Sequence, residues 1–408
     1  MEKVFYDAVT PEGLRIVAEK AVTDVVYCGL FVDAGTRDEV DDDGGLAHFC
    51  EHASFKGTPG RKAWMIRNCL ESVGGDINAY TNKEETVFYA TVGRRDLDRA
   101  VALLFDIVFR SSYPEAELER EKGVIIDEMD SYRDSPAELI YDEFEEMIFR
   151  GHALGRNILG TAERVGAYTA GDVRAWAQRH YRVDNATFFV YGNVDGEQVR
   201  RLAEKHGGGL VRGAAAKRRM PLPPYVSEVR TREHQTHQAH VMTGARAWGS
   251  NDDRRWGLAL LNNMVGGPGM NSLLNVALRE KRGLVYTVES SLYCYTDAGV
   301  WSVYFGCEEK DVTRCRRFVE GVLERLADRP LTEGRLRRAK KQFTGQLRIA
   351  EDNFCDHALA LGKMYARTGR LRKVDDICRR IDALTPEELQ RTVREVLDSG
   401  GLTTLVYR

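Results

Sequence analysis

The hydrophobic positions of the chain fall into two kinds of pattern. Five segments are rich in β-branched and aromatic residues, which is typical of strands: residues 25–35, 85–93, 186–194, 299–307 and 401–408. Three segments instead repeat their apolar residues with the period of a helix: residues 96–110, 116–133 and 385–400. The last helix is expected to begin with Thr385 as its N-cap and Pro386 at its first helical position.

These strands and helices are interspersed without the regular alternation of a doubly wound sheet. The order predicts an α+β fold, in which each half of the chain forms a mostly antiparallel sheet with helices packed on one face. A stretch rich in glycine, alanine, basic residues and proline lies near the middle of the chain. It predicts a linker at residues 211–224 between a first domain, residues 1–210, and a second domain, residues 225–408.

The two halves share weak internal similarity. Residues 45–48 resemble residues 257–260, and residues 118–122 resemble residues 336–340. When the halves are aligned on these matches, His48, Glu51 and His52 correspond to Leu260, Asn263 and Met264. Glu121 and Glu128 correspond to Ala339 and Gln346. Duplication followed by loss of a site in one copy accounts for both matches, and coincidence is the alternative.

Composition describes an ordinary soluble protein. The chain has 408 residues, which suits two or three domains, with 43% hydrophobic and 30% charged residues. A net charge of −3 gives no reason to expect nucleic-acid binding. No signal peptide or membrane-spanning run is recognised, and the eight cysteines form no CxxC pair. We therefore expect reduced cysteines, no membrane partner and a cytoplasmic location.

The candidate chemistry begins with the string His48-Phe49-Cys50-Glu51-His52. On a helix, His48 and His52 lie one turn apart on the same face, and Glu51 lies beside them. Two imidazoles at this spacing can hold one Zn²⁺ ion, and the carboxylate can reach its water. Cys50 points away from this face and is expected in the core. A single helical histidine is more often structural, so the assignment depends on a third ligand.

The predicted helix at residues 116–133 offers that third ligand. Glu121 and Glu128 are seven residues apart and share one helix face. Glu128 is the candidate third ligand, and Glu121 suits the orientation of a ligand histidine. Val124 and Ile125 are expected to anchor this helix in the core. Considered alone, the two glutamates would fit a solvated face equally well.

Two other features have competing interpretations. His234, His237 and His240 could suggest a metal-storage or metal-sensing protein, but strand alternation places His237 on the opposite face from the other two. Residues 115–146 hold 13 acidic and three basic side chains. They form either ordinary solvated helix faces or an acidic wall that attracts basic peptides.

The motif and its surroundings resemble the pitrilysin, insulinase and mitochondrial-processing-peptidase family of inverted zinc peptidases. Glu128 lies 76 residues after His52, and Glu121 matches the assisting carboxylate of that family. Asn78 and Ala79 match the strand region that lines the family's cleft. Residues 278–286 are similar to its substrate-binding motif, whose spacing selects Arg279 and Tyr286.

The resemblance implies a zinc metalloendopeptidase with one Zn²⁺ per chain, held by His48, His52 and Glu128. It makes Glu51 and Glu121 catalytic, with Tyr286 contributing to catalysis and binding, while Arg279, Asn78 and Ala79 bind substrate. It also implies that two homologous halves form half of a clamshell, and that a homodimer with composite active sites encloses unfolded peptides or precursor segments in a chamber. The alternative is a non-catalytic peptide-binding or scaffold subunit of the same fold.

Overall fold

The computed structural model describes residues 4–40, 43–210, 212–213, 219–234 and 236–408. The chain forms two compact units. The first unit comprises Met1–Asp130, Arg156–Met220 and Ala350–Arg372. The second unit comprises Ser131–Gly155, Pro221–Ile349 and Lys373–Arg408.

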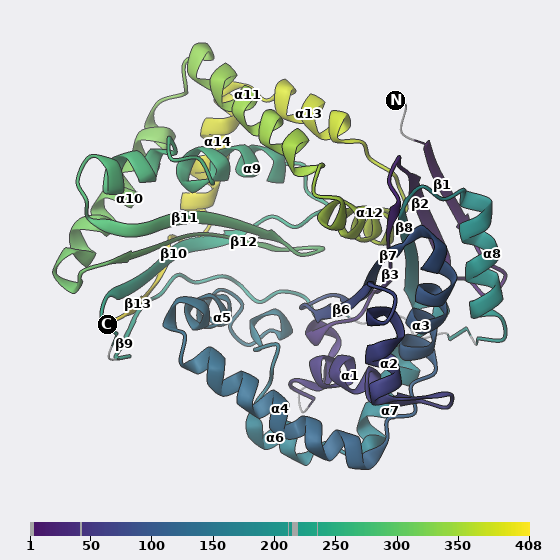
Figure 1. Ribbon diagram of the computed structural model, residues 1–408. Coiled ribbons are helices and arrows are strands. Elements are labelled where there is room, and N and C mark those ends of the chain that lie inside the picture. Colours follow the sequence, from purple (N-terminus) through teal and green to yellow (C-terminus); the bar gives the residue numbers. More distant parts are fainter. Residues whose placement is uncertain (1–3, 41–42, 211, 214–218, 235) are drawn as a thin grey trace. The chain divides into compact units, whose positions relative to one another are not determined.

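The first unit contains a six-stranded sheet with the order β1-β2-β8-β3-β7-β6 (Figure 1). Its strands are β1 (Val4–Val9), β2 (Arg15–Lys20), β3 (Val25–Val32), β6 (Asp76–Thr81), β7 (Thr86–Gly93) and β8 (Ala186–Gly192). Only β2 and β8 pair in parallel, and the other pairs are antiparallel. Strand β6 is the last strand at one edge of this sheet.

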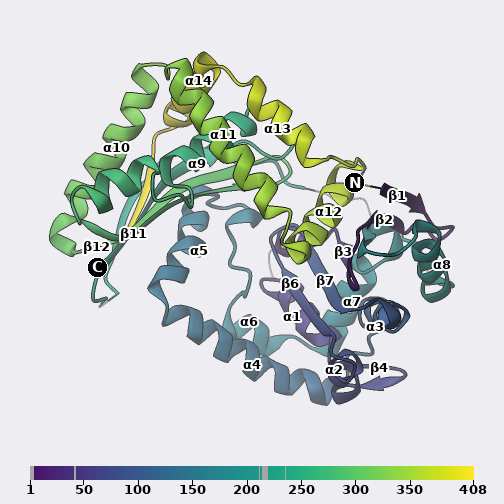
Figure 2. The same ribbon diagram turned by 45° about the horizontal axis from the view of Figure 1, so that its top comes forward.

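Helices cover one face of this sheet, and a further helix covers part of the other. The first face packs against α1 (Leu46–Ser54), α2 (Ala63–Glu71), α3 (Leu97–Phe109), α7 (Ala170–His180) and α8 (Gly196–Gly207). Alternate side chains of the strands, such as Val17, Phe31 and Phe189, point to the opposite face. There they meet Leu361 of α12 (Phe354–Thr368), which lies across the sheet from α3 and α8 (Figures 1 and 2).

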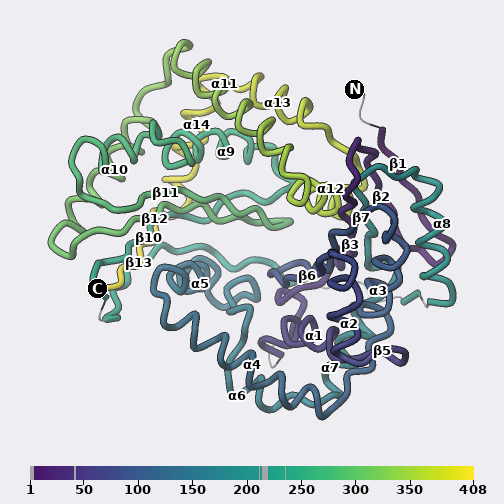
Figure 3. Tube along the Cα trace, viewed as in Figure 1, coloured from purple at the N-terminus to yellow at the C-terminus, as the bar shows by residue number. Residues whose placement is uncertain are grey.

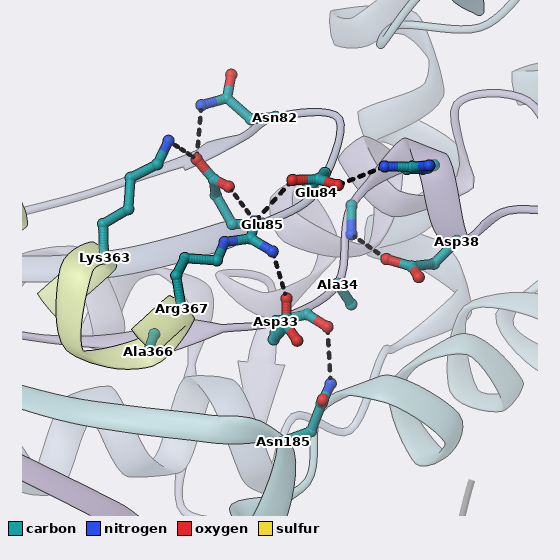
Figure 4. A network of polar contacts seen from close by, with 12 residues as sticks. Asp33, Ala34, Asp38, Asn82, Glu84, Glu85, Asn185, Lys363, Ala366 and Arg367 are labelled. Atoms are coloured by element: carbon teal, nitrogen blue, oxygen red, sulfur yellow. Dashed lines mark hydrogen bonds and ion pairs between the residues drawn. The ribbon is translucent and has the colours of Figure 1, made fainter. Parts of the chain in front are cut away.

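Charged side chains join α12 to the loops at the end of the sheet (Figure 4). The Arg367 guanidinium lies 3.0 Å from Asp33 and 2.6 Å from Glu85, and Lys363 also pairs with Glu85. Glu85 is only 3% exposed. Because an unpaired charge would be costly at this depth, the two cations fix where the helix docks.

The second unit contains a five-stranded sheet with the order β11-β12-β10-β13-β9. Its strands are β9 (Val229–Arg232), β10 (Ala239–Ala247), β11 (Val285–Cys294), β12 (Gly299–Cys307) and β13 (Thr403–Tyr407). One face packs against α9 (Arg255–Gly266), α10 (Val312–Asp328) and α14 (Pro386–Asp398), with α11 (Glu333–Ala350) and α13 (Val374–Ala383) beside them. The other face packs against α5 (Pro136–Ile148), so that α9 and α5 lie on opposite sides of β10 and β12 (Figure 3).

The predicted α+β fold of two similar halves is confirmed. Read from β9, the second sheet has the order β9-β13-β10-β12-β11, which corresponds to β2-β8-β3-β7-β6 of the first sheet, and β1 has no counterpart. The one parallel pair of each sheet, β2 with β8 and β9 with β13, lies at the corresponding place. The similar segments found in the sequence lie on α1 and α9, and on α4 (Glu115–Arg133) and α11. All five predicted strands and all three predicted helices form, and Thr385 caps α14 by accepting a hydrogen bond from the Glu388 amide.

The compact units differ from the predicted domains 1–210 and 225–408 in two segments. Ser131–Gly155, which carries α5, belongs to the second unit, and Ala350–Arg372, which carries α12, belongs to the first. The predicted linker, 211–224, lies partly outside the described residues, and its described part holds neither helix nor strand. Within the described chain, no helix combines the length and apolarity needed to cross a membrane.

Candidate metal centre

Helix α1 begins at a tightly packed turn. Gly45 has a φ of 87°, and a Cβ atom at this position would lie 2.5 Å from the Leu159 carbonyl oxygen, so glycine is required. The Glu39 carboxylate accepts hydrogen bonds from the Gly45 amide at 3.3 Å and from the Ala47 amide at 2.9 Å. These bonds occupy amides that have no partner within the helix and fix the start of α1.

Three candidate ligand atoms converge beside α1. Nε2 of His52 lies 3.6 Å from Oε2 of Glu128, and Nε2 of His48 lies 3.9 Å from the same oxygen. The two imidazole rings are 4.5 Å apart between centroids. Among the described residues, His48, His52 and Glu128 are the one group of this kind whose donor atoms all lie within 4.8 Å of one another.

Helix α4 supplies both candidate glutamates, as its seven-residue spacing predicts. Glu121 is 6% exposed, and its Oε1 lies 2.9 Å from Nδ1 of His52. Its other oxygen, Oε2, lies 2.5 Å from the Lys56 ammonium group. Ile125 is buried as expected, but the expectation for Val124 is wrong, because its side chain is 50% exposed. The buried residues of α4 form a narrow stripe (Leu118, Glu121, Ile125 and Met129), and Val124 lies outside it.

Glu51 lies beside the histidines and is held by a hydroxyl group. The Thr81 hydroxyl, at the end of β6, donates a hydrogen bond of 2.7 Å to Oε2 of Glu51. Both side chains are buried, with exposed fractions of 7% for Thr81 and 6% for Glu51. Cys50 is fully buried on the other side of the helix, as predicted.

The burial of these groups changes their protonation. Desolvation and the neighbouring His52 lower the pKa of His48 to about 3, which keeps its imidazole neutral. Desolvation raises the pKa of Glu51 to about 7, although the bond from Thr81 opposes this shift. Burial alone would raise the pKa of Glu121, but its bonds with His52 and Lys56 outweigh burial and lower it.

This donor set fits Zn²⁺. Two imidazole nitrogens and one carboxylate oxygen are a common ligand set for catalytic zinc, which leaves one position for water. A neutral His48 retains a lone pair for a metal. The Glu121 carboxylate can hold a proton on Nδ1 of His52, which leaves Nε2 free to bind. A carboxylate in that position is the usual partner of a zinc-bound histidine.

The candidate substrate-binding residues lie in separate parts of the chain. Asn78 and Ala79 lie on the edge strand β6, where the Asn78 side chain accepts a hydrogen bond of 2.8 Å from the Ala79 amide. Arg279 and Tyr286 belong to the second unit, on the short helix Asn275–Glu280 and on β11. Both are exposed, Tyr286 by 66% of its surface.

Two histidines of the competing metal-storage interpretation, His234 and His240, have other partners. The His234 ring contacts the Tyr407 ring at a tilt of 38°, with ring centroids 4.1 Å apart. His240 is buried on β10 and lies 2.8 Å from the Tyr304 hydroxyl through Nδ1. Together with His237 they form no candidate metal group in the part of the chain that is described.

Sequence reasoning missed three residues that shape the centre. Glu39 caps α1, Thr81 holds Glu51, and Lys56 holds Glu121. Sequence position could have indicated Lys56, because it lies four residues, about one helical turn, after His52, although α1 itself ends at Ser54.

Comparisons with known proteins cover nearly the whole chain. The model of insulinase (peptidase family M16) matches residues 15–162, and that of the peptidase M16 inactive domain matches residues 167–343. An uncharacterized zinc protease of Streptomyces coelicolor is 34% identical over 401 residues, covering 95% of this chain and 86% of the relative.

Two further proteins extend this similarity. The beta subunit of the mitochondrial-processing peptidase of Mus musculus is 32% identical over 390 residues, covering 93% of this chain and 79% of the relative. The crystal structure of a protease from Helicobacter pylori matches with a TM-score of 0.91 at 21% identity, covering 100% of this chain and 99% of the other. At this identity the structural match shows the fold alone.

Proposed function

The chain belongs to the insulinase family, peptidase family M16, and we propose that it is a zinc-dependent endopeptidase in which Glu51 is the general base. The observation that carries the proposal is the convergence of Nε2 of His48, Nε2 of His52 and Oε2 of Glu128 beside Glu51. The relatives named zinc proteases support the same activity.

The chain's own residues prepare the reaction. His48, His52 and Glu128 would hold one Zn²⁺ ion per chain. When bound, zinc supplies a Lewis acid that lowers the pKa of water and polarises the scissile carbonyl. Glu51 accepts the proton of the attacking water and returns it to the departing amine. The Thr81 hydroxyl keeps the Glu51 carboxylate oriented through both transfers.

Strand β6 offers a place for the substrate. It lies at the edge of its sheet and ends at Thr81, the residue bonded to Glu51. A peptide added along this edge could make backbone hydrogen bonds whatever its sequence, and its scissile bond would run toward Glu51. We assign Asn78 and Ala79 to this strand addition. Such binding requires an extended chain, so unfolded peptides are the proposed substrates.

Arg279 and Tyr286 complete the proposed site. An exposed tyrosine hydroxyl can donate a hydrogen bond to a developing oxyanion, and an arginine can bind a peptide carbonyl or carboxylate. We propose that they act on the substrate of a partner chain in a homodimer that encloses the peptide. Their exposure in the isolated chain is consistent with a role toward a second molecule.

A chelator test with one variant checks the activity. The metal-replete protein should cleave members of a mixed peptide library, and removal of zinc with a chelator should stop cleavage. Glu51→Gln should retain one zinc per chain and cleave roughly 100- to 10,000-fold more slowly, which is the usual contribution of a general base. A chain that binds no zinc and cleaves nothing would favour the non-catalytic subunit.

The ligand assignment has its own readout. His48→Ala, His52→Ala and Glu128→Ala should each lower zinc content, measured by elemental analysis after dialysis. Glu51→Gln is the matched control, because its side chain lies beside the ligands and is not one of them. Full zinc content in Glu128→Ala would place the third ligand elsewhere.

A further inference from the structure

A concave site lies in the second unit, and none of the residues assigned above lines it. It is a hollow of about 1060 Å³ between the short helix Asn275–Glu280, α10, and the start of α11. Its walls come from one unit, so its shape depends on that unit alone. The volume is at the upper end of the range that small-molecule sites occupy.

The floor of the hollow is apolar. Val322, Leu326 and Leu331 line it and are buried, and Val276 and Phe318 are partly buried beside them. The Arg282 guanidinium lies over the Phe318 ring, 4.1 Å from its centroid, and donates a hydrogen bond to the Ala277 carbonyl. An apolar floor of this size favours a ligand with an apolar body.

The rim carries a strong positive charge. Five basic residues and one acidic residue line the hollow: Lys281, Arg282, Arg325, Arg329, Arg335 and Asp328. All six are exposed. This concentration contrasts with the whole chain, whose net charge is −3.

These cations are also largely unneutralised. Over the described ranges, Lys281, Arg325, Arg329 and Arg335 make no ion pair with a carboxylate, although many other arginines of the chain do. Like charges that converge on one hollow repel one another, and an anion placed among them removes that cost. The arrangement therefore favours an anionic head group at the rim.

We propose that this hollow binds an amphipathic anion, with a phosphate or carboxylate head among the basic side chains and an alkyl body on the apolar floor. Inorganic phosphate would use the rim and leave the floor unfilled. A flat membrane surface would meet the exposed rim without reaching the buried floor residues. A single molecule that enters the hollow satisfies both parts.

Calorimetric titration of the full chain with dodecyl phosphate, kept below its micelle concentration, tests the proposal. Saturable binding of one molecule per chain is expected at low salt. Butyl phosphate should bind at least roughly 100-fold more weakly, because most of the buried methylene groups are lost. Dodecyltrimethylammonium, which has the same alkyl chain and the opposite charge, should not bind.

Two triple variants that lose the same number of positive charges distinguish binding in the hollow from general electrostatic attraction to the chain. Lys281→Gln with Arg325→Gln and Arg329→Gln should weaken binding roughly tenfold or more, since individual exposed ion pairs are weak but several act together. Arg317→Gln with Arg337→Gln and Arg338→Gln removes three exposed charges from positions on α10 and α11 that do not line the hollow, and should leave the affinity unchanged.

Four outcomes would overturn the proposal. Equal weakening in the two variants would reduce the effect to general electrostatic attraction. Equal affinity for inorganic phosphate would remove the role of the floor. Binding to anionic phospholipid vesicles without binding of dodecyl phosphate would indicate a membrane surface instead. Absence of any saturable binding to the unmodified chain would leave the hollow without a ligand of this class.

Discussion

At the residue scale, the candidate metal centre depends on side chains that act through others. The two carboxylate oxygens of Glu121 contact His52 and Lys56, so the orientation of His52, a candidate ligand, also depends on Lys56. Similarly, the Thr81 hydroxyl holds Glu51 and also lies 3.4 Å from the Thr86 hydroxyl. Both arrangements lead to tests that separate metal binding from catalysis.

Substitution of Glu121 or Lys56 should change zinc affinity. Glu121→Gln should raise the zinc Kd by about 10- to 100-fold, the usual effect of removing the partner of a ligand histidine. Lys56→Met should raise it less, roughly tenfold at most, because it acts through Glu121. Competition with a chromophoric chelator measures both, and Lys62→Met on the exposed strand β5 (Arg61–Lys62) is the control. An unchanged Kd in Glu121→Gln would contradict its role.

Substitution of Thr81 should change turnover and not zinc content. Thr81→Val keeps the shape of the side chain and removes the hydroxyl, so Glu51 loses its hydrogen bond. We expect kcat to fall roughly tenfold, with KM and bound zinc unchanged, because proton transfer depends on the position of the base. Thr81→Ser retains the hydroxyl and should retain most of the turnover. If Val and Ser variants are equally impaired, packing is responsible and not the hydrogen bond.

Much of this centre was predictable from sequence because helical spacing is regular. His48, His52, Glu121 and Glu128 needed only a helix at each place to fall on common faces, and both helices form. The contacts of Thr81 and Glu39 were not predictable, since they join elements distant in sequence and depend on tertiary packing. The error at Val124 has the same origin, because a helical period does not say how wide the buried stripe is.

At the element scale, the unexpected feature is that each unit includes a helix from the other half of the sequence. The sequence does predict strands and helices, but an amphipathic helix can pack on any apolar sheet face. Both faces of the first sheet are apolar near β3 and β8, and α12 covers the one opposite α3. The ion pairs of Arg367 and Lys363 in Figure 4 specify that contact, and no local pattern reveals their partners.

The docking of α12 should depend on pH through Glu85. Burial alone would raise the pKa of Glu85, but Lys363 and Arg367 outweigh it and lower the pKa below its ordinary value. The carboxylate therefore stabilises the fold above its unfolded pKa of about 4.3, and this stability is lost as the pH falls through the lower folded value.

Denaturant unfolding between pH 7 and pH 3 measures this effect. Glu85→Gln should lower the free energy of unfolding by about 3 kcal/mol at pH 7, because it leaves the largely buried Arg367 guanidinium partly unpaired. The difference from the unmodified chain should shrink as the pH falls below about 4.3. Glu71→Gln, on the exposed end of α2, should change little at any pH. A constant difference across the whole range would show that the charge of Glu85 is not the cause.

At the scale of the whole molecule, the two sheets share one strand order, but among the described residues the candidate metal centre lies in the first unit alone. The positions of α9 that align with His48 and His52 hold Leu260 and Met264. Helix α9 therefore packs on its sheet as α1 does, but it has no candidate metal ligand at these positions. The second unit instead presents Arg279 and Tyr286 on its surface. A homodimer of such chains would contain two copies of each functional segment.

Complementation between inactive variants tests the proposed composite site. One variant is Glu51→Gln, and the other combines Arg279→Ala with Tyr286→Phe. In a mixed dimer whose sites each draw the two motifs from different chains, one site carries every defect and the other carries none. Co-expression with two affinity tags should therefore yield mixed dimers with about half the activity per dimer of the unmodified protein, since one of the two sites is restored.

If both motifs served a site within one chain, every site would keep a defect and no activity would return. Such a result in well-folded, zinc-loaded mixed dimers would exclude sharing between chains, and the roles of His48, His52 and Glu128 would be unaffected.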